Sequence, residues 1–410
     1  MKKKLLLYGF GIVGKGFLNH FLESQLQEEI ECIGIIVKNP DKHSNLSFQL
    51  CKYGSDEEKL LFQKADIIIE CTNDFEEGVK IIQSALENHK VVISASKKVL
   101  AEKLELWKQL LKNTQGVLLF EAAAAASIPI FRILNHHFLN EKVLSIQGIL
   151  NGTSNFILTK MENDNLDYLS ALNLAKNLGY AELNPYLDVS GWDTAYKMIL
   201  LALLGLEIQI STQSILVEGI QNIRFRDIFL AKECGFKIKL LATCGFLENH
   251  LIFEVIPHFI DKNSFFYTVN EANNGIIVNY EKVGEQFYYG KGAGSNATGS
   301  AIMGDLSFYL KNFNGYCFNQ NVIPGNLSSS NGFFYLSIHQ FFDVFCDTYT
   351  NQLDIIHQDP INHNLLVNSS LEFLIKIKNE FLSPIQIIKI SNEKILNIIL
   401  HQKKFSNLLL

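Results

Sequence analysis

The sequence predicts an α/β protein whose N-terminal part is a doubly wound parallel sheet. Over the first 130 residues, apolar runs bounded by glycine or polar turns alternate with stretches of helical period, which is the order of βαβ units. Residues 65–69 are nearly all apolar, as expected of a strand covered on both faces of its sheet. A glycine-rich turn at residues 9–14 lies between the first apolar run and the first helical stretch. Together these observations assign the chain to the α/β class.

The individual elements follow from local patterns. Strands are expected where short apolar runs lie between turn signals, and helices where apolar residues recur at intervals of three and four. In the N-terminal part this predicts strands at residues 4–8, 30–37, 65–71, 91–94 and 116–120, and helices at 16–26, 78–88 and 104–112. From residue 143 onward it predicts a second α/β domain with strands at 143–150, 238–246 and 251–256, and helices at 155–161, 168–178 and 192–204.

The last part of the chain has its own order of elements. Residues 324–332 (PGNLSSSNG) are the most linker-like stretch, so we expect a domain boundary there. The elements expected after it are a strand at 333–338, a helix at 341–348, strands at 353–357 and 364–368, a helix at 371–381 and a strand at 385–390. This βαββαβ order is that of a small ferredoxin-like module.

Composition excludes several classes of protein. Of the 410 residues, 48% are hydrophobic and 19% are charged, as in a globular protein with two or three domains. Lysine and arginine number 36 against 42 acidic residues, so nucleic acid is not an expected partner. The longest apolar run, residues 198–205, is far shorter than the ~20 residues of a membrane span, so no membrane is expected either. No two cysteines form a C-x-x-C pair, and we therefore expect all seven to be reduced thiols, as in a cytoplasmic protein. They are Cys32, Cys51, Cys71, Cys234, Cys244, Cys317 and Cys346.

The most specific local pattern is G-x-G-x-x-G at residues 9–14 (GFGIVG). Gly9 allows a tight turn, Gly11 lets the backbone approach a pyrophosphate, and Gly14 lets the helix lie close to the sheet. The N–H groups at the start of the helix face the anion. The pattern predicts dinucleotide binding, and a plain glycine turn is the alternative.

Polar residues at strand ends refine this prediction. The second strand ends at Lys38, where an NAD-preferring site usually has an acidic residue for the ribose hydroxyls. A cation there favours the 2′-phosphate of NADP, and a solvated lysine is the ordinary alternative. Thr72 and Lys97 follow two further strands, at the carboxyl ends where ligands of such sheets bind. Lys97 is either a surface lysine or one that points into the crevice.

A charged motif, GYAELNPYLDVSGWDTAYK, covers residues 179–197 and leads into an apolar helix. Asp193 and Lys197 are four residues apart, so they share one helix face in the favourable acid-before-base order. Exposed pairs of this kind are common. Here, however, Glu182, Asp188 and Asp193 gather with the lysine beside an apolar helix, where unpaired charge is costly. We interpret these residues as a candidate polar substrate site.

Two other stretches have an ordinary and a functional interpretation. Residues 289–306 are a glycine-rich loop before a helix of small residues, which is either a flexible loop or a place of close approach to a ligand. Glu121 is followed by five alanines. This is either an alanine-rich helix start or a turn whose carbonyls, with the Glu121 carboxylate, surround a hard cation.

Taken in order, these stretches resemble the homoserine dehydrogenase family over residues 4–310. The motifs that carry the resemblance are GFGIVG, SASK, EAAAAASIPI, GILNGTSNFIL, GYAELNPYLDVSGWDTAYK and GKGAGSNATGSAIMGDL. The resemblance implies an NAD(P)-dependent oxidoreductase that interconverts L-homoserine and L-aspartate 4-semialdehyde, in the pathway to threonine, methionine and isoleucine. It implies NADP as the cofactor, with NAD as the alternative, a small-molecule substrate, and a homodimer or homotetramer.

The resemblance also implies roles for individual residues. Lys197 matches the family's proton donor, and Glu182 and Asp193 match its substrate carboxylates. We expect Lys97 to assist Lys197, Asp193 to orient it, and Asp188 and Thr153 to contribute to substrate binding. The expected cofactor contacts are Gly9, Phe10, Gly11, Ile12, Val13, Gly14, Lys38, Thr72, Lys97, Gly179 and Gly294. The family's sodium site matches Glu121 with the carbonyls of Ala124, Ala126 and Ile128, although this chain has alanines where the family has EA-x-V-G-x-G-I-P.

The expected architecture is an NAD(P)-binding Rossmann domain at residues 1–130, completed by 286–323, a catalytic and dimerisation domain at 131–285, and an ACT-like module at 333–410. The acidic-Pro-Gly-Val-Leu loop of ligand-binding ACT domains is missing, because Ile338 is followed by HQFFD. We therefore expect a module that is structural or involved in subunit contacts, without feedback binding of threonine. A catalytically silent relative and a reductase acting on another small amino aldehyde are the alternative functions.

Overall fold

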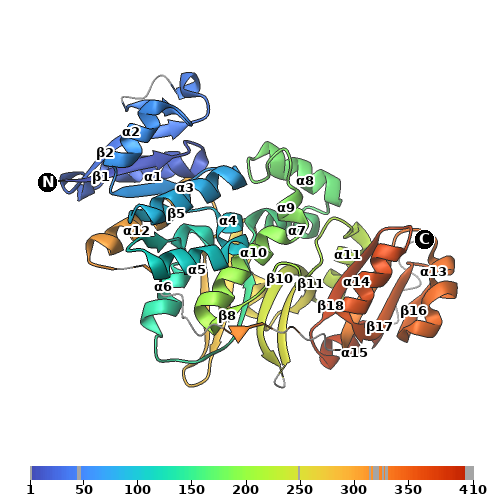
Figure 1. Cartoon of the computed structure of the whole chain (residues 1–410). Coiled ribbons are helices and arrows are strands. Elements are labelled where there is room, and N and C mark those ends of the chain that lie inside the picture. The colour runs from blue at the N-terminus through green and yellow to red at the C-terminus, as the bar shows by residue number, and fades with distance from the viewer. Residues whose placement is uncertain are drawn as a thin grey trace. The chain divides into compact units, whose positions relative to one another are not determined.

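The N-terminal strands form the parallel sheet that the sequence predicts. In the computed structural model (Figure 1) their order is β3-β2-β1-β4-β5-β6, and every neighbouring pair is parallel. This is the order of doubly wound dinucleotide-binding folds. The strands are β1 (Lys3–Tyr8), β2 (Ile30–Val37), β3 (Leu50–Lys52), β4 (Ile67–Glu70), β5 (Val91–Ser94) and β6 (Val117–Leu119). All of β4 is buried, as its apolar sequence predicts for a sheet covered on both faces.

The structure describes residues 2–43, 48–247, 250–313, 315–316, 323–325, 327 and 331–401. They divide into two compact units. The first comprises residues 1–142, 199–209 and 290–324, and the second comprises 143–198, 210–289 and 325–410. The expected division into three domains stays a prediction, and parts of 286–323 and 324–332, with Cys317, lie outside the described residues.

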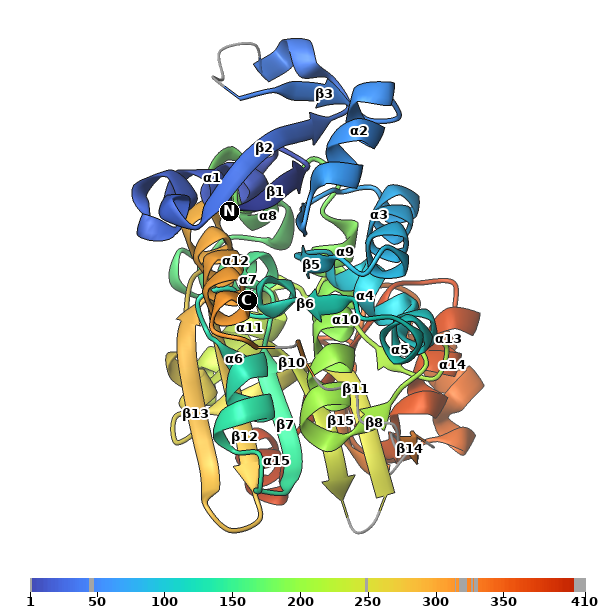
Figure 2. The same cartoon turned by 60° about the vertical axis from the view of Figure 1, so that its left-hand side comes forward.

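The helices of the first unit cover its sheet. They are α1 (Ile12–Glu23), α2 (Asp56–Lys64), α3 (Phe75–Glu87), α4 (Lys97–Glu102), α5 (Leu104–Asn113), α6 (Ile130–Arg132) and α12 (Ser295–Leu310). Helix α12, from far along the chain, packs directly on α1 (Figure 2). Small residues make this possible, because a Cβ at Gly16 would lie 2.0 Å from the Ser295 carbonyl oxygen. A short two-stranded sheet of β8 (Ile208–Gln209) and β14 (Ile323–Pro324) also belongs to this unit.

The second unit is built on a mixed sheet of order β13-β12-β7-β10-β11-β18-β15-β17-β16, with β9 paired to β11. Its strands before the C-terminal part are β7 (Val143–Ile149), β9 (Leu216–Val217), β10 (Phe236–Leu247), β11 (His250–Asp261), β12 (Asn273–Tyr280) and β13 (Gly284–Lys291). Its helices there are α7 (Gly152–Asn163), α8 (Tyr168–Asn177), α9 (Tyr186–Val189), α10 (Trp192–Leu201) and α11 (Phe225–Glu233). The sequence predicted α7, α8 and α10, but not α9, α11, β9, β12 or β13.

The C-terminal part has the predicted βαββαβ order. Its elements are β15 (Asn331–Ile338), α13 (Phe342–Tyr349), β16 (Asp354–Asp359), β17 (Asn364–Ser370), α14 (Leu371–Glu380) and β18 (Ile385–Ile390), followed by α15 (Glu393–His401), which the sequence did not predict. Strands β15, β16, β17 and β18 pair antiparallel with one another, and β18 pairs parallel with β11. The module is therefore continuous with the sheet of the second unit, and its ACT-like identity stays a prediction.

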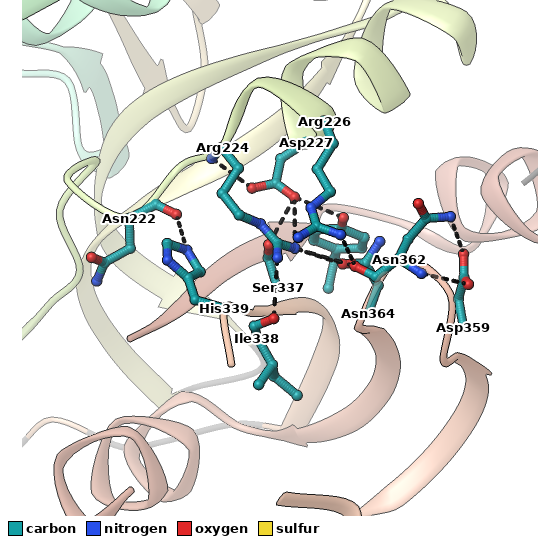
Figure 3. Close-up of polar contacts among 11 residues, drawn as sticks. Asn222, Arg224, Arg226, Asp227, Ser337, Ile338, His339, Asp359, Asn362 and Asn364 are labelled. Atoms are coloured by element: carbon teal, nitrogen blue, oxygen red, sulfur yellow. Dashed lines mark hydrogen bonds and ion pairs between the residues drawn. The ribbon is translucent and has the colours of Figure 1, made fainter. Parts of the chain in front are cut away.

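A buried polar junction ties the module to the start of α11 (Figure 3). The Asp227 carboxylate is fully buried and accepts hydrogen bonds from the hydroxyls of Tyr335 and Ser337, at 2.9 and 2.8 Å. The Arg224 guanidinium donates to the Ile338 carbonyl at 3.1 Å and to the Asn364 side chain at 2.9 Å. Because Ile338 ends β15, the loop after this strand is held by α11.

Candidate functional site

The glycine turn has the geometry that its sequence predicts. Gly9 has a φ of +88°, and a Cβ there would lie 2.5 Å from the Cys71 carbonyl oxygen. A Cβ at Gly14 would lie 2.2 Å from the Gly9 carbonyl oxygen, so α1 can approach the turn only with glycine at this position. Gly11 caps α1 and has no atom within 4 Å of its Cβ position. The turn is closed on the protein side and open at Gly11, as an anion site at a helix N-terminus requires.

A cavity of about 440 Å³ lies at this turn, in the first unit. Phe10 and Ile12 line it, and Val13 follows, half-buried, in the first turn of α1, so the roles of these three residues as cofactor contacts stay predictions. Four basic residues also line the cavity: Lys15, Lys38, Lys42 and His43. Of these, the sequence singled out only Lys38.

The structure gives Lys38 partners within the protein. Its Nζ lies 3.1 Å from Asp74 Oδ2 and 3.4 Å from Glu77 Oε1, and the side chain is 59% exposed. Hydrogen bonds to Asp74 and Glu77 raise the pKa of Lys38. Lys38 therefore stays charged at the cavity, with part of its hydrogen-bonding capacity used by α3.

Glu70, which the sequence did not single out, organises the neighbouring strand ends. It is fully buried at the end of β4, and its Oε1 accepts hydrogen bonds from the Thr72 hydroxyl at 2.6 Å and the Ser96 hydroxyl at 2.9 Å. Its Oε2 accepts a hydrogen bond from the Ser94 hydroxyl at 2.5 Å. Glu70 thus holds the predicted cofactor residue Thr72 in place. An acidic residue ending an otherwise apolar strand was the available signal.

Two more predicted residues of the first unit lie at helix starts. Lys97 is the first residue of α4 and is half-buried. Gly294 caps α12 with a φ of +109° and has no atom within 4 Å of its Cβ position. Both positions suit ligand contact, and neither role is tested.

In the second unit, the predicted lysine is buried among oxygen acceptors. Lys197 is 6% exposed on α10. Its Nζ lies 2.8 Å from Asp193 Oδ2 and donates a hydrogen bond to the Leu150 carbonyl at 2.7 Å. The i,i+4 pair is therefore a buried ion pair with 4% exposure at Asp193, in contrast to the exposed alternative.

Asn151 joins the two predicted carboxylates of this motif. Its Nδ2 donates to Asp188 Oδ1 at 2.7 Å and to Asp193 Oδ2 at 2.9 Å. Its Oδ1 accepts a hydrogen bond from the Ser154 N–H at 2.7 Å, which caps α7. The sequence contained a signal, because Asn151 lies in GILNGTSNFIL, but no role was predicted for it. Asp188, Asp193 and Lys197 thus come together through residues 150–151.

The remaining predicted residues of this unit lie at one turn. The Thr153 hydroxyl donates to the Tyr180 carbonyl at 2.6 Å, next to Gly179, whose φ is +77°. Glu182 is exposed and makes no hydrogen bond or ion pair with another residue in the described part of the chain. Among the described residues Glu182 thus forms no hydrogen bond or ion pair with the Lys197 group, and its role in substrate binding stays a prediction.

The carboxylate at the start of the alanine stretch binds groups of the protein itself. Glu121 begins a short 3₁₀ helix, Glu121–Ala123, and is fully buried. Its Oε1 accepts a hydrogen bond from the Phe131 N–H at 2.9 Å, and its Oε2 accepts from the Arg132 N–H and Nε, both at 3.0 Å, and from the Tyr316 hydroxyl at 2.8 Å. The Glu121 carboxylate is therefore occupied by donors of the protein itself, and the place of Glu121 in a sodium site built from backbone oxygens stays a prediction.

The carbonyls of the predicted sodium site are a separate question. The Ile128 carbonyl accepts a hydrogen bond from the Ile130 N–H at 2.8 Å, and Ala126 has a φ of +45°. The roles of Ala124, Ala126 and Ile128 stay predictions. Within the described ranges, no cluster of three or more histidine, cysteine or acidic side chains is arranged to hold a metal ion. Nor does any helix in those ranges have the length and apolar character needed to cross a membrane.

Asp305 lies beside Glu121 and completes this cluster. Its Oδ2 accepts a hydrogen bond from the Glu121 N–H at 2.8 Å, and its Oδ1 lies 3.1 Å from the Tyr316 hydroxyl. Burial, reinforced by the Glu121 charge, raises the pKa of Asp305 to about 8. The single Tyr316 hydrogen cannot serve both carboxylates, so a proton on Asp305 satisfies the geometry.

Comparison with known proteins agrees with this arrangement. Residues 9–117 match the family model described as "Homoserine dehydrogenase, NAD binding domain", and residues 129–307 match "Homoserine dehydrogenase". A homoserine dehydrogenase of Helicobacter pylori is 35% identical over 318 residues, which cover 75% of this chain and 74% of that protein.

Solved structures give the same result. A homoserine dehydrogenase of Thiobacillus denitrificans aligns over 96% of this chain and 99% of its own with a TM-score of 0.81 and 25% identity. A homoserine dehydrogenase of S. aureus aligns over 96% of this chain and 100% of its own, with a TM-score of 0.71 and 29% identity. The chain belongs to the homoserine dehydrogenase family, whose members are NAD(P)-dependent oxidoreductases that act on the CH–OH group of homoserine and interconvert it with the aldehyde of aspartate 4-semialdehyde.

Proposed function

We propose that Lys197 donates the proton in this reaction. The observation that carries the proposal is the buried ion pair of Lys197 and Asp193, with the Leu150 carbonyl as the second acceptor of the ammonium. When bound, the reduced nicotinamide supplies the hydride that the aldehyde carbon accepts. Negative charge then develops on the former carbonyl oxygen. An ammonium held at that oxygen stabilises the charge and transfers one proton to it, which completes the alcohol.

The carboxylates of the same unit serve the substrate's cationic end and the lysine. Asp193 holds the Lys197 ammonium, and Asn151 sets Asp188 beside Asp193. The substrate carries an ammonium group, which requires an acceptor. Asp188 and Glu182 are our candidates, with Thr153 at the turn that precedes Glu182. Lys97, in the first unit, remains the candidate second lysine.

The test replaces Lys197 by methionine, which keeps the length of the side chain and removes the charge. We expect kcat to fall by about three orders of magnitude or more, because both proton transfer and charge stabilisation are lost. NADPH affinity, measured by fluorescence titration, should stay within about twofold, since no cofactor contact is removed. A kcat close to that of the unmodified enzyme would contradict the proposal.

Lys239 provides a matched control in the same unit. It is fully buried and donates to Asn155 Oδ1 at 2.9 Å and to the Val269 carbonyl at 2.7 Å. Burial lowers the pKa of Lys239 to about 7. Lys239→Met removes an equally buried lysine, so it should change stability while leaving kcat nearly unchanged.

We further propose that the preferred cofactor is NADP. The cavity at the glycine turn is lined by Lys15, Lys38, Lys42 and His43, and none of the described residues in its lining is acidic. A 2′-phosphate adds about two negative charges that such a lining favours, whereas the ribose hydroxyls of NAD usually meet an acidic residue. Because Lys38 is paired with Asp74, Lys42 and His43 are the additional candidates for the phosphate.

Charge reversal at Lys42 tests this preference. Lys42→Glu should lower kcat/KM for NADPH by about 10- to 100-fold and leave NADH within about twofold, because only NADPH carries the phosphate. Lys64→Glu makes the same change of charge at an exposed residue of α2 outside the cavity lining, and should affect neither cofactor. Equal losses with both cofactors would contradict a 2′-phosphate site.

Two predictions complete the proposal. The expected homodimer or homotetramer is retained from the family resemblance. A cytoplasmic location is supported by the six described cysteines, which are all free thiols, while Cys317 lies outside the described residues.

A further inference from the structure

We infer that Asn274 is a positioning residue for Lys197. The inference rests on the proposed role of Lys197 and concerns a residue in none of the motifs considered above. Asn274 is the second residue of β12 and is fully buried. Its Nδ2 donates a hydrogen bond of 3.1 Å to the Leu150 carbonyl, which is the same oxygen that accepts the Lys197 ammonium at 2.7 Å.

The shared oxygen gives Asn274 a defined mechanical effect. A carbonyl oxygen has two lone pairs, and here one receives the ammonium and the other receives the amide. With both occupied, the Leu150 peptide cannot rotate without breaking a buried hydrogen bond. The direction of the Lys197 ammonium is then set by two fixed acceptors, Leu150 and Asp193. Supporting hydrogen bonds of this kind keep a reacting group in productive geometry.

The location of Asn274 supports this function independently of the hydrogen bond. Its neighbour Gly275 pairs with Ile149 in the β12–β7 ladder, so the backbone brings Asn274 next to Leu150. Its Oδ1 is buried and has no hydrogen-bond partner among the described residues. The amide orientation is chemically determined, because Oδ1 facing the Leu150 carbonyl would set two acceptors together. A buried acceptor without a donor lowers the stability of the fold. An apolar residue at position 274 would avoid this cost, so we attribute the asparagine to the hydrogen bond that it donates to Leu150.

The first experiment compares Asn274→Leu with Asn273→Leu. Asn273 is the adjacent residue of the same strand, and its Nδ2 also donates to a backbone carbonyl, that of Asn270 at 2.9 Å. Each variant therefore loses one asparagine-to-carbonyl hydrogen bond, but only Asn274→Leu frees the Leu150 oxygen. We expect Asn274→Leu to lower kcat by about 10- to 100-fold, as displacement of a reacting group does, with NADPH affinity unchanged. Asn273→Leu should alter thermal stability alone.

The second experiment uses Asn274→Asp, which retains size and polarity. A protonated carboxyl group can donate to the Leu150 carbonyl in place of the amide, whereas an ionised one cannot. The alkaline limb of the kcat pH profile should therefore move down to the pH at which this carboxyl ionises, whereas a carboxylate that acted only through its charge would move the limb up. A merely structural asparagine would not move this limb. The variant also keeps the inference testable should Asn274→Leu fail to fold.

The outcomes separate this inference from the proposed function. If Lys197→Met is inactive while both Asn274 variants match Asn273→Leu in kcat and in pH profile, the positioning role is wrong and the role of Lys197 stands. If Lys197→Met retains its activity, the proposed function is wrong and the positioning role has no reacting group to support. The expected pattern is loss of activity in Lys197→Met, a smaller loss in Asn274→Leu and the displaced limb in Asn274→Asp.

Discussion

Two buried polar clusters of this chain, one around Glu121 and one around Lys197, use the same kinds of charged group in different ways. The Glu121 carboxylate is surrounded by main-chain N–H groups, the Arg132 guanidinium and the Tyr316 hydroxyl. Around Lys197, Asn151 joins Asp188 to Asp193 by side-chain hydrogen bonds. Main-chain donors cannot move without moving the fold, so the first cluster is suited to holding structure. In the second cluster one main-chain carbonyl, that of Leu150, accepts the Lys197 ammonium, and the spacing of the two carboxylates depends on the Asn151 side chain.

The largest effect on stability is expected at Glu121. Glu121→Gln removes the charge that balances Arg132, and breaking a buried ion pair costs about 3–5 kcal/mol of unfolding free energy. Urea denaturation measures this loss. Glu105→Gln is the control, because Glu105 is 65% exposed in its contact with Lys108 and such pairs contribute about 0–1 kcal/mol. Equal stability of the two variants would show that the Glu121 cluster does not hold the fold.

An intermediate effect, on activity instead of stability, is expected at Asn151. Asn151→Ser keeps an oxygen to cap α7 and removes the amide that joins Asp188 and Asp193. We expect kcat/KM for aspartate 4-semialdehyde to fall by about 10- to 100-fold because the two carboxylates lose their spacing. The unfolding free energy should change by less than about 1 kcal/mol. A stability loss as large as that of Glu121→Gln, without loss of activity, would reverse the comparison.

The smallest effect is a pH dependence in the Glu121 cluster. The ordinary pKa of an aspartate is 3.8, and that of Asp305 is raised to about 8, so the folded form holds a proton that the unfolded chain has lost between these values. Stability from this group is fully present below pH 3.8 and is lost as the pH rises through about 8. Asp305→Asn keeps a neutral side chain and should remove this slope. Urea denaturation at pH 5 and 8 should show the wild type losing at least about 1 kcal/mol more than the variant. Parallel losses in the two proteins would contradict a protonated Asp305.

The sequence predicted the features that depend on neighbouring residues. The order of strands and helices follows from periodicity, and it was correct for the βαββαβ order of the C-terminal part, whereas elements such as α2, α11, β12 and β13 were not predicted. Residues four apart lie on the same face of any helix, so the proximity of Asp193 and Lys197 could be predicted. In the structure their side chains form an ion pair. The alanine stretch shows the limit of this reasoning, because no local pattern indicated that Arg132 and Tyr316 would bind the Glu121 carboxylate.

What the sequence by itself determined is therefore the parallel-sheet strands β1, β2, β4, β5 and β6, the glycine turn and the charged motif of α10, since each depends on local backbone preference or spacing. Only the tertiary structure decided which residues, distant in the sequence, form hydrogen bonds with these elements. Asn151 reaches Asp193 over 42 residues, Asn274 reaches Leu150 over 124, and Tyr316 reaches Glu121 over 195. Contacts at such separations arise when the strands and helices pack and buried polar groups find partners. No local pattern specifies those partners, so Asn151, Asn274 and the donors around Glu121 became visible only in the folded chain.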